Sequence, residues 1–156
     1  MRGEILTALG ATPRLMERLV RVFPTDRLDD RPSHADLSPR MAIASLADNE
    51  TLILERIRLA NLRPGIAFDS INALERAKEF HYDEKDVFHE AEVYESRRMM
   101  TVEYLQGLHD TDWNKTMILS GVAVTIADYV GLVLSNDIMH LDQISRHLAT
   151  EVATLS

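Results

Sequence analysis

The chain has 156 residues, a length typical of one domain, so residues 1–156 are treated as a single folding unit. It contains no cysteine, which excludes disulfides, thiolate metal sites and cysteine nucleophiles. Its formal net charge of −8 argues against nucleic acid as a partner, and no apolar run has the length of a signal peptide core or a membrane span. We therefore expect a cytoplasmic protein with neither nucleic-acid nor membrane partners.

Apolar residues recur at helical spacing in four segments of the chain. The first two segments begin with a capping residue followed by proline, and the last begins with a capping box formed by Thr125 and Asp128. Gly107 is a natural end for the third segment. The expected helices cover residues 13–23, 39–61, 84–107 and 126–150.

The remaining segments are predicted to be connections. Residues 25–37 are charged and predict a loop, whereas residues 66–82 are ambiguous, with Asp69 as a candidate cap for a short helix ending near Lys78. No stretch alternates cleanly enough between apolar and polar residues to predict a β-strand. Four amphipathic helices with one long second connection predict an all-α, antiparallel four-helix bundle with a long crossover connection.

Two charged residues occupy central positions on stripes that are otherwise apolar. Glu50 lies on the stripe of the second expected helix, and Arg98 lies on that of the third. Because charged residues are rarely buried without a partner, we expect Glu50 and Arg98 to form an ion pair that fixes the register of the two helices. The alternative is a pocket in which the Glu50 carboxylate acts as an acid or a base.

The last expected helix carries an apolar stripe that includes Leu134 and Ile138, and a polar stripe lies beside it. At about 100° per residue, the members of the polar stripe fall within roughly 60° of one another. They are Tyr129, Asn136, His140, Gln143 and His147. Such a stripe either forms a boundary that faces solvent or a partner, or lines a polar cavity between helices.

Several motifs, taken in order, resemble the DinB/YfiT-like family. Residues 37–40 (Leu-Ser-Pro-Arg) resemble the family's tryptophan-Ser-Pro-Arg segment, and residues 45–48 (Ser-Leu-Ala-Asp) resemble its His-Leu-Ala-Asp motif. Residues 136–144 (Asn-Asp-Ile-Met-His-Leu-Asp-Gln-Ile) are similar to its closing His-Asp-x-x-His-Leu-x-Gln-Ile motif. The resemblance covers residues 5–148 and implies a DinB/YfiT-like four-helix bundle.

Members of this family typically hold a divalent metal ion with three histidines, two of them four residues apart on the last helix. Carried over by the resemblance, the three ligand positions are Ser45, Asn136 and His140. Only His140 keeps an imidazole, and a serine hydroxyl or an asparagine amide is a poorer ligand for zinc or nickel. The sequence therefore predicts a degenerate metal site in which Ser45, Asn136 and His140 face a small polar pocket.

Two main hypotheses for function follow. The first is a metal-free binding module for a small molecule, and family members together with Met99 and Met100 suggest a homodimer. The second is a metal-dependent hydrolase or low-molecular-weight-thiol transferase that uses His140 with non-standard ligands. Those ligands would come from Asp48, Glu50, His81 or His89. A third class, a stress-related protein that binds partner helices on the bundle surface, stays open.

Overall fold

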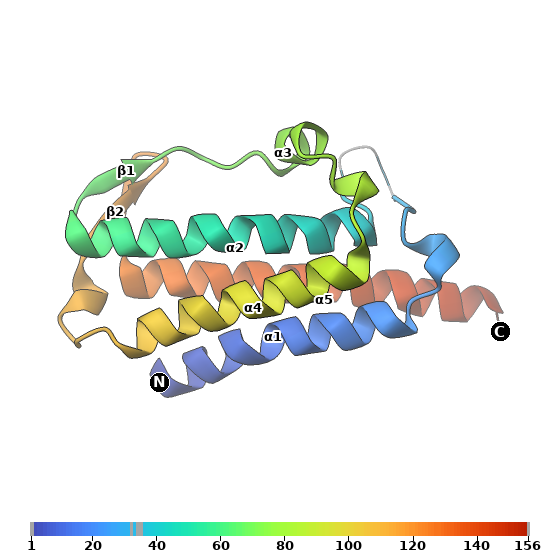
Figure 1. Cartoon of the computed structure of the whole chain (residues 1–156), viewed down its shortest axis with the longest axis horizontal. Helices are drawn as coiled ribbons and strands as arrows, with labels where there is room; N and C mark the ends of the chain where they lie inside the picture. Colours follow the sequence, from blue (N-terminus) through green and yellow to red (C-terminus); the bar gives the residue numbers. More distant parts are fainter. Residues whose placement is uncertain (1, 32, 34–35, 156) are drawn as a thin grey trace.

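A computed structural model describes residues 2–31, 33 and 36–155 of the chain. In this part of the chain four long helices pack side by side as a bundle (Figure 1). They are α1 (Arg2–Val22), α2 (Pro39–Leu62), α4 (Val87–Gln106) and α5 (Ile126–Leu155). Helices α1 and α5 run in one direction and α2 and α4 in the other, which confirms the prediction of an antiparallel four-helix bundle. None of the described helices combines the length and apolar character that a membrane span needs.

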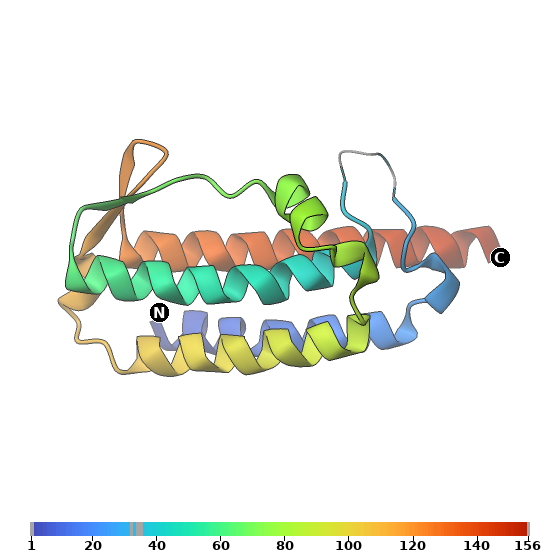
Figure 2. The same ribbon diagram turned by 45° about the horizontal axis from the view of Figure 1, so that its top comes forward.

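The connection between α2 and α4 is the predicted long crossover. It leaves the bundle after α2, returns along its length and enters α4 at the other end, so α2 and α4 are parallel neighbours (Figure 2). It contains β1 (Ile66–Phe68), α3 (Ala73–Glu79) and the 3-10 helix η2 (Tyr82–Glu84). The cap of α3 is Asn72, whose side chain accepts a hydrogen bond from the Glu75 N–H at 3.1 Å. The predicted cap at Asp69 is wrong, because the chain is still outside any helix there.

A small sheet closes one end of the bundle, and the sequence predicts none of it. Strands β2 (Thr116–Leu119) and β3 (Val122–Thr125) form a hairpin, and β1 pairs in parallel with β2, with Ile66 opposite Met117. Strands of three or four residues are too short to show an alternating pattern, and the β1–β2 pairing joins segments far apart in sequence. The hairpin turn uses φ angles of 50° at Ser120 and 80° at Gly121, a left-handed conformation that suits glycine.

The first helix starts well before the predicted residue 13, so that prediction is wrong. Pro13 lies inside α1 and cannot donate a hydrogen bond to the carbonyl of Leu9, four residues earlier. The structure supplies another donor, because the side chain of Arg98 in α4 binds the Leu9 carbonyl oxygen at 3.1 Å. A tertiary contact therefore satisfies the backbone group that the proline leaves unpaired, and the helix continues through it.

The predicted start signals of α2 and α5 are confirmed. The Ser38 hydroxyl accepts a hydrogen bond from the Met41 N–H at 3.2 Å, with proline at the first helical position. At α5, the Asp128 N–H donates to the Thr125 hydroxyl at 3.0 Å, and the Thr125 N–H donates to the Asp128 carboxylate at 3.2 Å. Helix α4 begins three residues later than predicted because Asp86 is its cap.

The apolar core has two main clusters along the bundle. One contains Met16, Leu46, Tyr94 and Ile144, and the other contains Leu9, Ile57, Val102 and Val133 together with Trp113 and Met117 near the sheet. On every long helix the first cluster occupies one half and the second the other half. The middle of the bundle, between them, is occupied by charged side chains.

Candidate functional site

A buried charge cluster centred on Arg98 crosses the middle of the bundle. Its guanidinium binds Glu50 through two hydrogen bonds, Nε to Oε2 at 2.8 Å and Nη2 to Oε1 at 2.9 Å. It also binds Asp137 on α5, with Nη1 at 2.6 Å from Oδ2 and Nη2 at 3.0 Å from Oδ1. The Tyr94 hydroxyl donates to Asp137 as well, at 3.2 Å. One arginine thus joins α1, α2, α4 and α5.

The structure brings the two predicted partners Glu50 and Arg98 together and adds Asp137, which sequence reasoning missed. The signal was present, since Asp137 lies four residues after Val133 and seven before Ile144, both of them buried on α5. The alternative role for Glu50 as a pocket acid or base fits poorly, because its side chain has no exposed surface and both oxygens bind Arg98.

The charge state of the cluster follows from its contacts. Burial alone would lower the pKa of Arg98, but hydrogen bonds to Asp137 and Glu50 outweigh it and raise that pKa. Burial has the opposite effect on the Tyr94 hydroxyl. It raises the pKa of this group, so the hydroxyl keeps its proton and remains a donor. The guanidinium stays positively charged between two carboxylates, an arrangement suited to holding helices in register.

The residues predicted to share a pocket lie on α2 and α5. Ser45 is buried, and its hydroxyl accepts a hydrogen bond from the Asn49 amide at 3.3 Å. His140 is partly buried, whereas Asn136 is exposed. Because Arg98 binds both Glu50 and Asp137, these two positions are level with each other. The helices are antiparallel, so Ser45, five residues before Glu50, and His140, three residues after Asp137, differ in level by only about 3 Å.

Two buried side-chain atoms in this region have no hydrogen-bond partner within the described structure: Asn49 Oδ1 and His140 Nδ1. Buried polar atoms almost always have a partner, supplied by the protein, by water or by a ligand. Asn49 was not singled out from the sequence, although its position four residues after Ser45 places both on one helix face. These two atoms are therefore open to a hydrogen bond from water or from a ligand.

The environment of His140 predicts its charge. Burial lowers its pKa, and the negative charge of Asp137 only partly opposes this, so the net shift is downward from 6.5. We expect an NMR titration of the His140 ring, assigned by its loss in His140→Gln, to give a pKa below 6.5. The unfolded chain then binds the proton more readily, so stability should fall as the pH drops below 6.5. A pKa above 6.5 would mean that the imidazolium, not the neutral ring, is held in the fold.

The residues present do not fit a three-ligand zinc or nickel centre. Across residues 2–31, 33 and 36–155, no group of three or more His, Asp or Glu side chains is arranged to hold a metal ion. Asp48 accepts hydrogen bonds from Arg76, at 2.8 Å, and from the Tyr82 hydroxyl, which fastens the crossover to α2. The remaining alternative donors, His81 and His89, lie exposed at the end of the crossover and in the first turn of α4.

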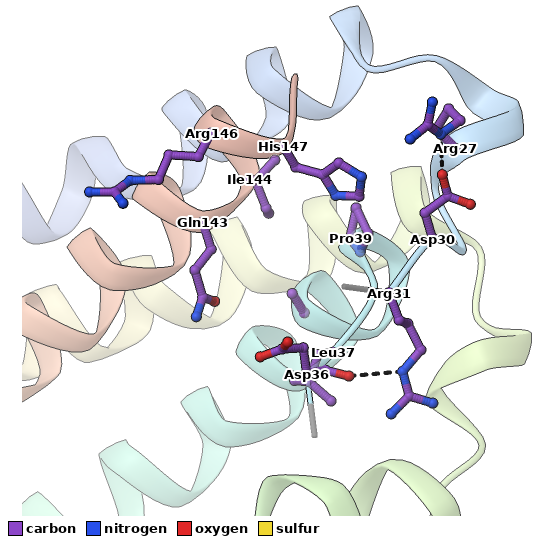
Figure 3. Close-up of a pocket in the computed structure, with 11 residues that line it drawn as sticks. Arg27, Asp30, Arg31, Asp36, Leu37, Pro39, Gln143, Ile144, Arg146 and His147 are labelled. Carbon is purple, nitrogen blue, oxygen red and sulfur yellow. Dashed lines mark hydrogen bonds and ion pairs between the residues drawn. The ribbon is translucent and has the colours of Figure 1, made fainter. Parts of the chain in front are cut away.

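A cavity of about 590 Å³ lies between the start of α2 and α5 (Figure 3). Two of its lining residues, Ala42 and Gln143, are about one helical turn from Ser45 and His140 in the sequence. It is lined by the first turn of α2, by α5 and by five residues of the loop before α2: Arg27, Asp30, Arg31, Asp36 and Leu37. The residues of α2 and α5 that line it include Ala42, Gln143 and His147. The cavity therefore lies between the same two helices that carry Ser45 and His140, although neither of these residues lines it.

Comparison with known proteins shows the fold. No protein-family model matches this sequence, and no curated protein does. Six chains of solved structures match it. One is YfiT from Bacillus subtilis, described as a probable metal-dependent hydrolase with an unusual four-helix bundle topology. The match covers 94% of this chain and 87% of that one, with a TM-score of 0.84 and 16% sequence identity. The predicted resemblance is confirmed: this protein has the YfiT-like four-helix bundle fold.

Proposed function

We propose that this protein is a DinB/YfiT-like binding module for a small molecule and that it works without a transition metal. The observation that supports this most is the chemistry of the three positions at which the family carries its histidines. Ser45 is buried and bonded to Asn49, Asn136 is exposed, and only His140 offers an imidazole. One strong donor is too few for a zinc site, which normally takes at least three protein ligands.

The same residues suit hydrogen-bonded binding. The Asn49 Oδ1 atom can only accept, so a ligand that reaches it must donate through a hydroxyl or amide group. The lowered pKa of His140 favours the neutral ring, whose two nitrogens are one donor and one acceptor. The Ser45 hydroxyl adds a group of either kind. Asn136 shares a helix face with His140 and would contact a ligand from the exposed side.

The direct test is the metal content of protein purified without chelators. We expect elemental analysis to find far less than one zinc or nickel ion per chain. Protein that carries one such ion per chain, and loses it in a His140→Ala variant, would overturn the proposal.

The second candidate is a metal-dependent hydrolase or a low-molecular-weight-thiol transferase. Two observations favour it: the fold shared with YfiT, and the Nδ1 atom of His140, which has no partner in the described structure. Its metal would need further ligands from Asp48 or Glu50, and both are bound to arginines. The elemental analysis above separates the two candidates.

We also propose that the protein is a homodimer that pairs through the outer face of α4. Met99 and Met100 are 45% and 52% exposed there, and burying adjacent apolar side chains against a second copy would favour association. Light scattering at micromolar concentration should report twice 17.7 kDa, and Met100→Glu should shift the mass toward the monomer. Lys78→Glu, an exposed change on α3, is the control. A wild-type monomer contradicts this prediction.

A further inference from the structure

The 590 Å³ cavity between the start of α2 and α5 has the size and the apolar wall of a small-molecule site. Such sites commonly measure about 300–1,000 Å³ and combine an apolar surface with a few polar groups. The apolar wall consists of Leu37, Pro39, Ala42 and Ile144. Ala42 and Ile144 belong to the first core cluster, and Leu37 packs against it. An apolar molecule placed here would therefore extend the core of the bundle.

Two polar side chains of α5 complete the lining. Gln143 and His147 are four residues apart, so they share one face of the helix. Figure 3 shows both projecting from α5 on the side of Leu37 and Pro39, and no hydrogen bond joins either of them to another residue drawn there. The Gln143 amide both donates and accepts, and the His147 ring offers an N–H donor in either charge state. A ligand with one polar group can therefore add a hydrogen bond to its apolar contacts.

The charged side chains that the loop before α2 contributes to the cavity are held by partners within the protein. Arg27 forms an ion pair with Asp30, and the Arg31 Nε donates to the main-chain carbonyl oxygen of Asp36 at 2.8 Å. The Asp36 carboxylate accepts a hydrogen bond from the Ser33 hydroxyl at 2.9 Å. This side of the cavity therefore presents paired charges to a ligand.

The arginine that α5 contributes is paired as well. The Arg146 Nε lies 3.0 Å from the Asp142 carboxylate, and Figure 3 shows the Arg146 side chain extending away from His147. Three arginines and two aspartates line the cavity, and Asp142 supplies a third negative charge, so these charges balance. None of the three arginines is free to serve as a partner for a ligand. An ionised group buried here would lose its hydration without gaining a counter-charge.

We infer that the cavity binds a small neutral molecule with an apolar ring body and one hydroxyl or amide group. The ring body lies against Leu37 and Ile144, and the polar group bonds to Gln143. The inference goes beyond the proposed function, because neither Ser45 nor His140 lines this cavity. It assigns a separate site whose preference for uncharged ligands follows from the paired charges around it.

The test is an NMR titration of the full-length protein with three compounds that share the naphthalene ring: neutral 2-naphthamide, the anion 2-naphthoate and the cation 2-naphthylmethylammonium. We expect 2-naphthamide to bind at least about threefold more tightly than either ion, because each ion gives up hydration without gaining a partner. A smaller preference, a preference for either ion, or no binding of the three compounds overturns the inference.

Matched variants at two exposed positions of α5 locate the binding. Gln143→Trp should fill the cavity and weaken 2-naphthamide binding, whereas Ser145→Trp, outside the cavity, should not. Gln143→Lys adds a cation to the lining and should raise the affinity for 2-naphthoate at least about threefold, whereas Ser145→Lys should leave it unchanged.

Two results with these variants would overturn the inference. One is 2-naphthamide binding that Gln143→Trp leaves unaffected, or that both tryptophan variants weaken equally. The other is an affinity for 2-naphthoate that does not rise in Gln143→Lys. Either result leaves the metal-free binding role in place, whereas one metal ion per chain overturns that role without removing this site.

Discussion

Replacing Arg98 with methionine should lower the free energy of unfolding by about 3–5 kcal/mol, the usual cost of breaking a buried ion pair from one side. Methionine keeps the length of the side chain but removes every donor. Glu50 and Asp137 would then remain buried with no cation, since their side chains are 0% and 1% exposed. Urea unfolding followed by circular dichroism measures the loss, because the described structure is mainly helical.

The neighbouring arginine provides the control. Arg97 is partly buried and donates to the Ala47 carbonyl at 2.6 Å, but it does not bind Glu50 or Asp137. Arg97→Met should therefore cost only about 0.5–1.5 kcal/mol, the net value of one ordinary hydrogen bond. Equal losses in the two variants would show that the charge cluster is not what makes Arg98 important.

Two double-mutant cycles separate the contacts of Arg98. Glu50→Ala and Arg98→Ala should each destabilise strongly, and the double variant should lose less than their sum, because no charge of that pair is left alone. Pro13→Ala tests the contact with α1, since alanine supplies the N–H that the Leu9 carbonyl lacks. The cost of Arg98→Met should then be about 1 kcal/mol smaller in the Pro13→Ala background. Strict additivity would mean that the Leu9 contact contributes nothing.

The same contact explains why the start of α1 was not predictable. A Thr-Pro pair is a sound local signal for a helix start, and nothing near it in sequence indicates otherwise. The donor that replaces the proline N–H comes from Arg98, 89 positions from Leu9. Similarly, β1 is defined by its pairing with β2, which follows α4 in the chain. Local patterns predicted the helices because helical hydrogen bonds are local.

The charge cluster was half predictable for a related reason. Glu50 and Arg98 lie at central positions of apolar stripes, so their pairing followed from the high cost of burying a lone charge. On α5 the predicted stripe included Leu134 and Ile138, but the buried positions are Val133 and Asp137, with Ile138 57% exposed. A shift of one residue turns a helix by about 100°, which exchanges Asn136 for Asp137 as the inward residue.

The rotation of α5 about its own axis determines whether residues 136 and 140 can face residue 45. The decisive experiment places histidine at the two positions where the DinB/YfiT-like family carries it and this chain does not. In Ser45→His with Asn136→His, residues 136 and 140 share one helix face, and residue 45 is nearly level with residue 140. We expect this variant to bind one nickel or zinc ion per chain. At a free metal concentration 100 times the dissociation constant, binding should add about 2.7 kcal/mol to its free energy of unfolding. The wild type should show no such gain. The matched control, Ser45→His with Ser135→His, turns one imidazole about 100° away and should not bind.

Placing histidine at the buried Ser45 position should cost about 1–3 kcal/mol through overpacking, so the metal-free variant must first be shown to be folded by circular dichroism. A folded variant that binds no metal would mean that the three positions do not converge on one point. A wild type that already carries one ion per chain would instead show that the site is not degenerate. Asp48, Glu50 and His81 would then be the residues to test as ligands, beginning with Asp48→Asn. In the wild type, the Asp48 carboxylate would become available to a metal ion if it released Arg76 and Tyr82.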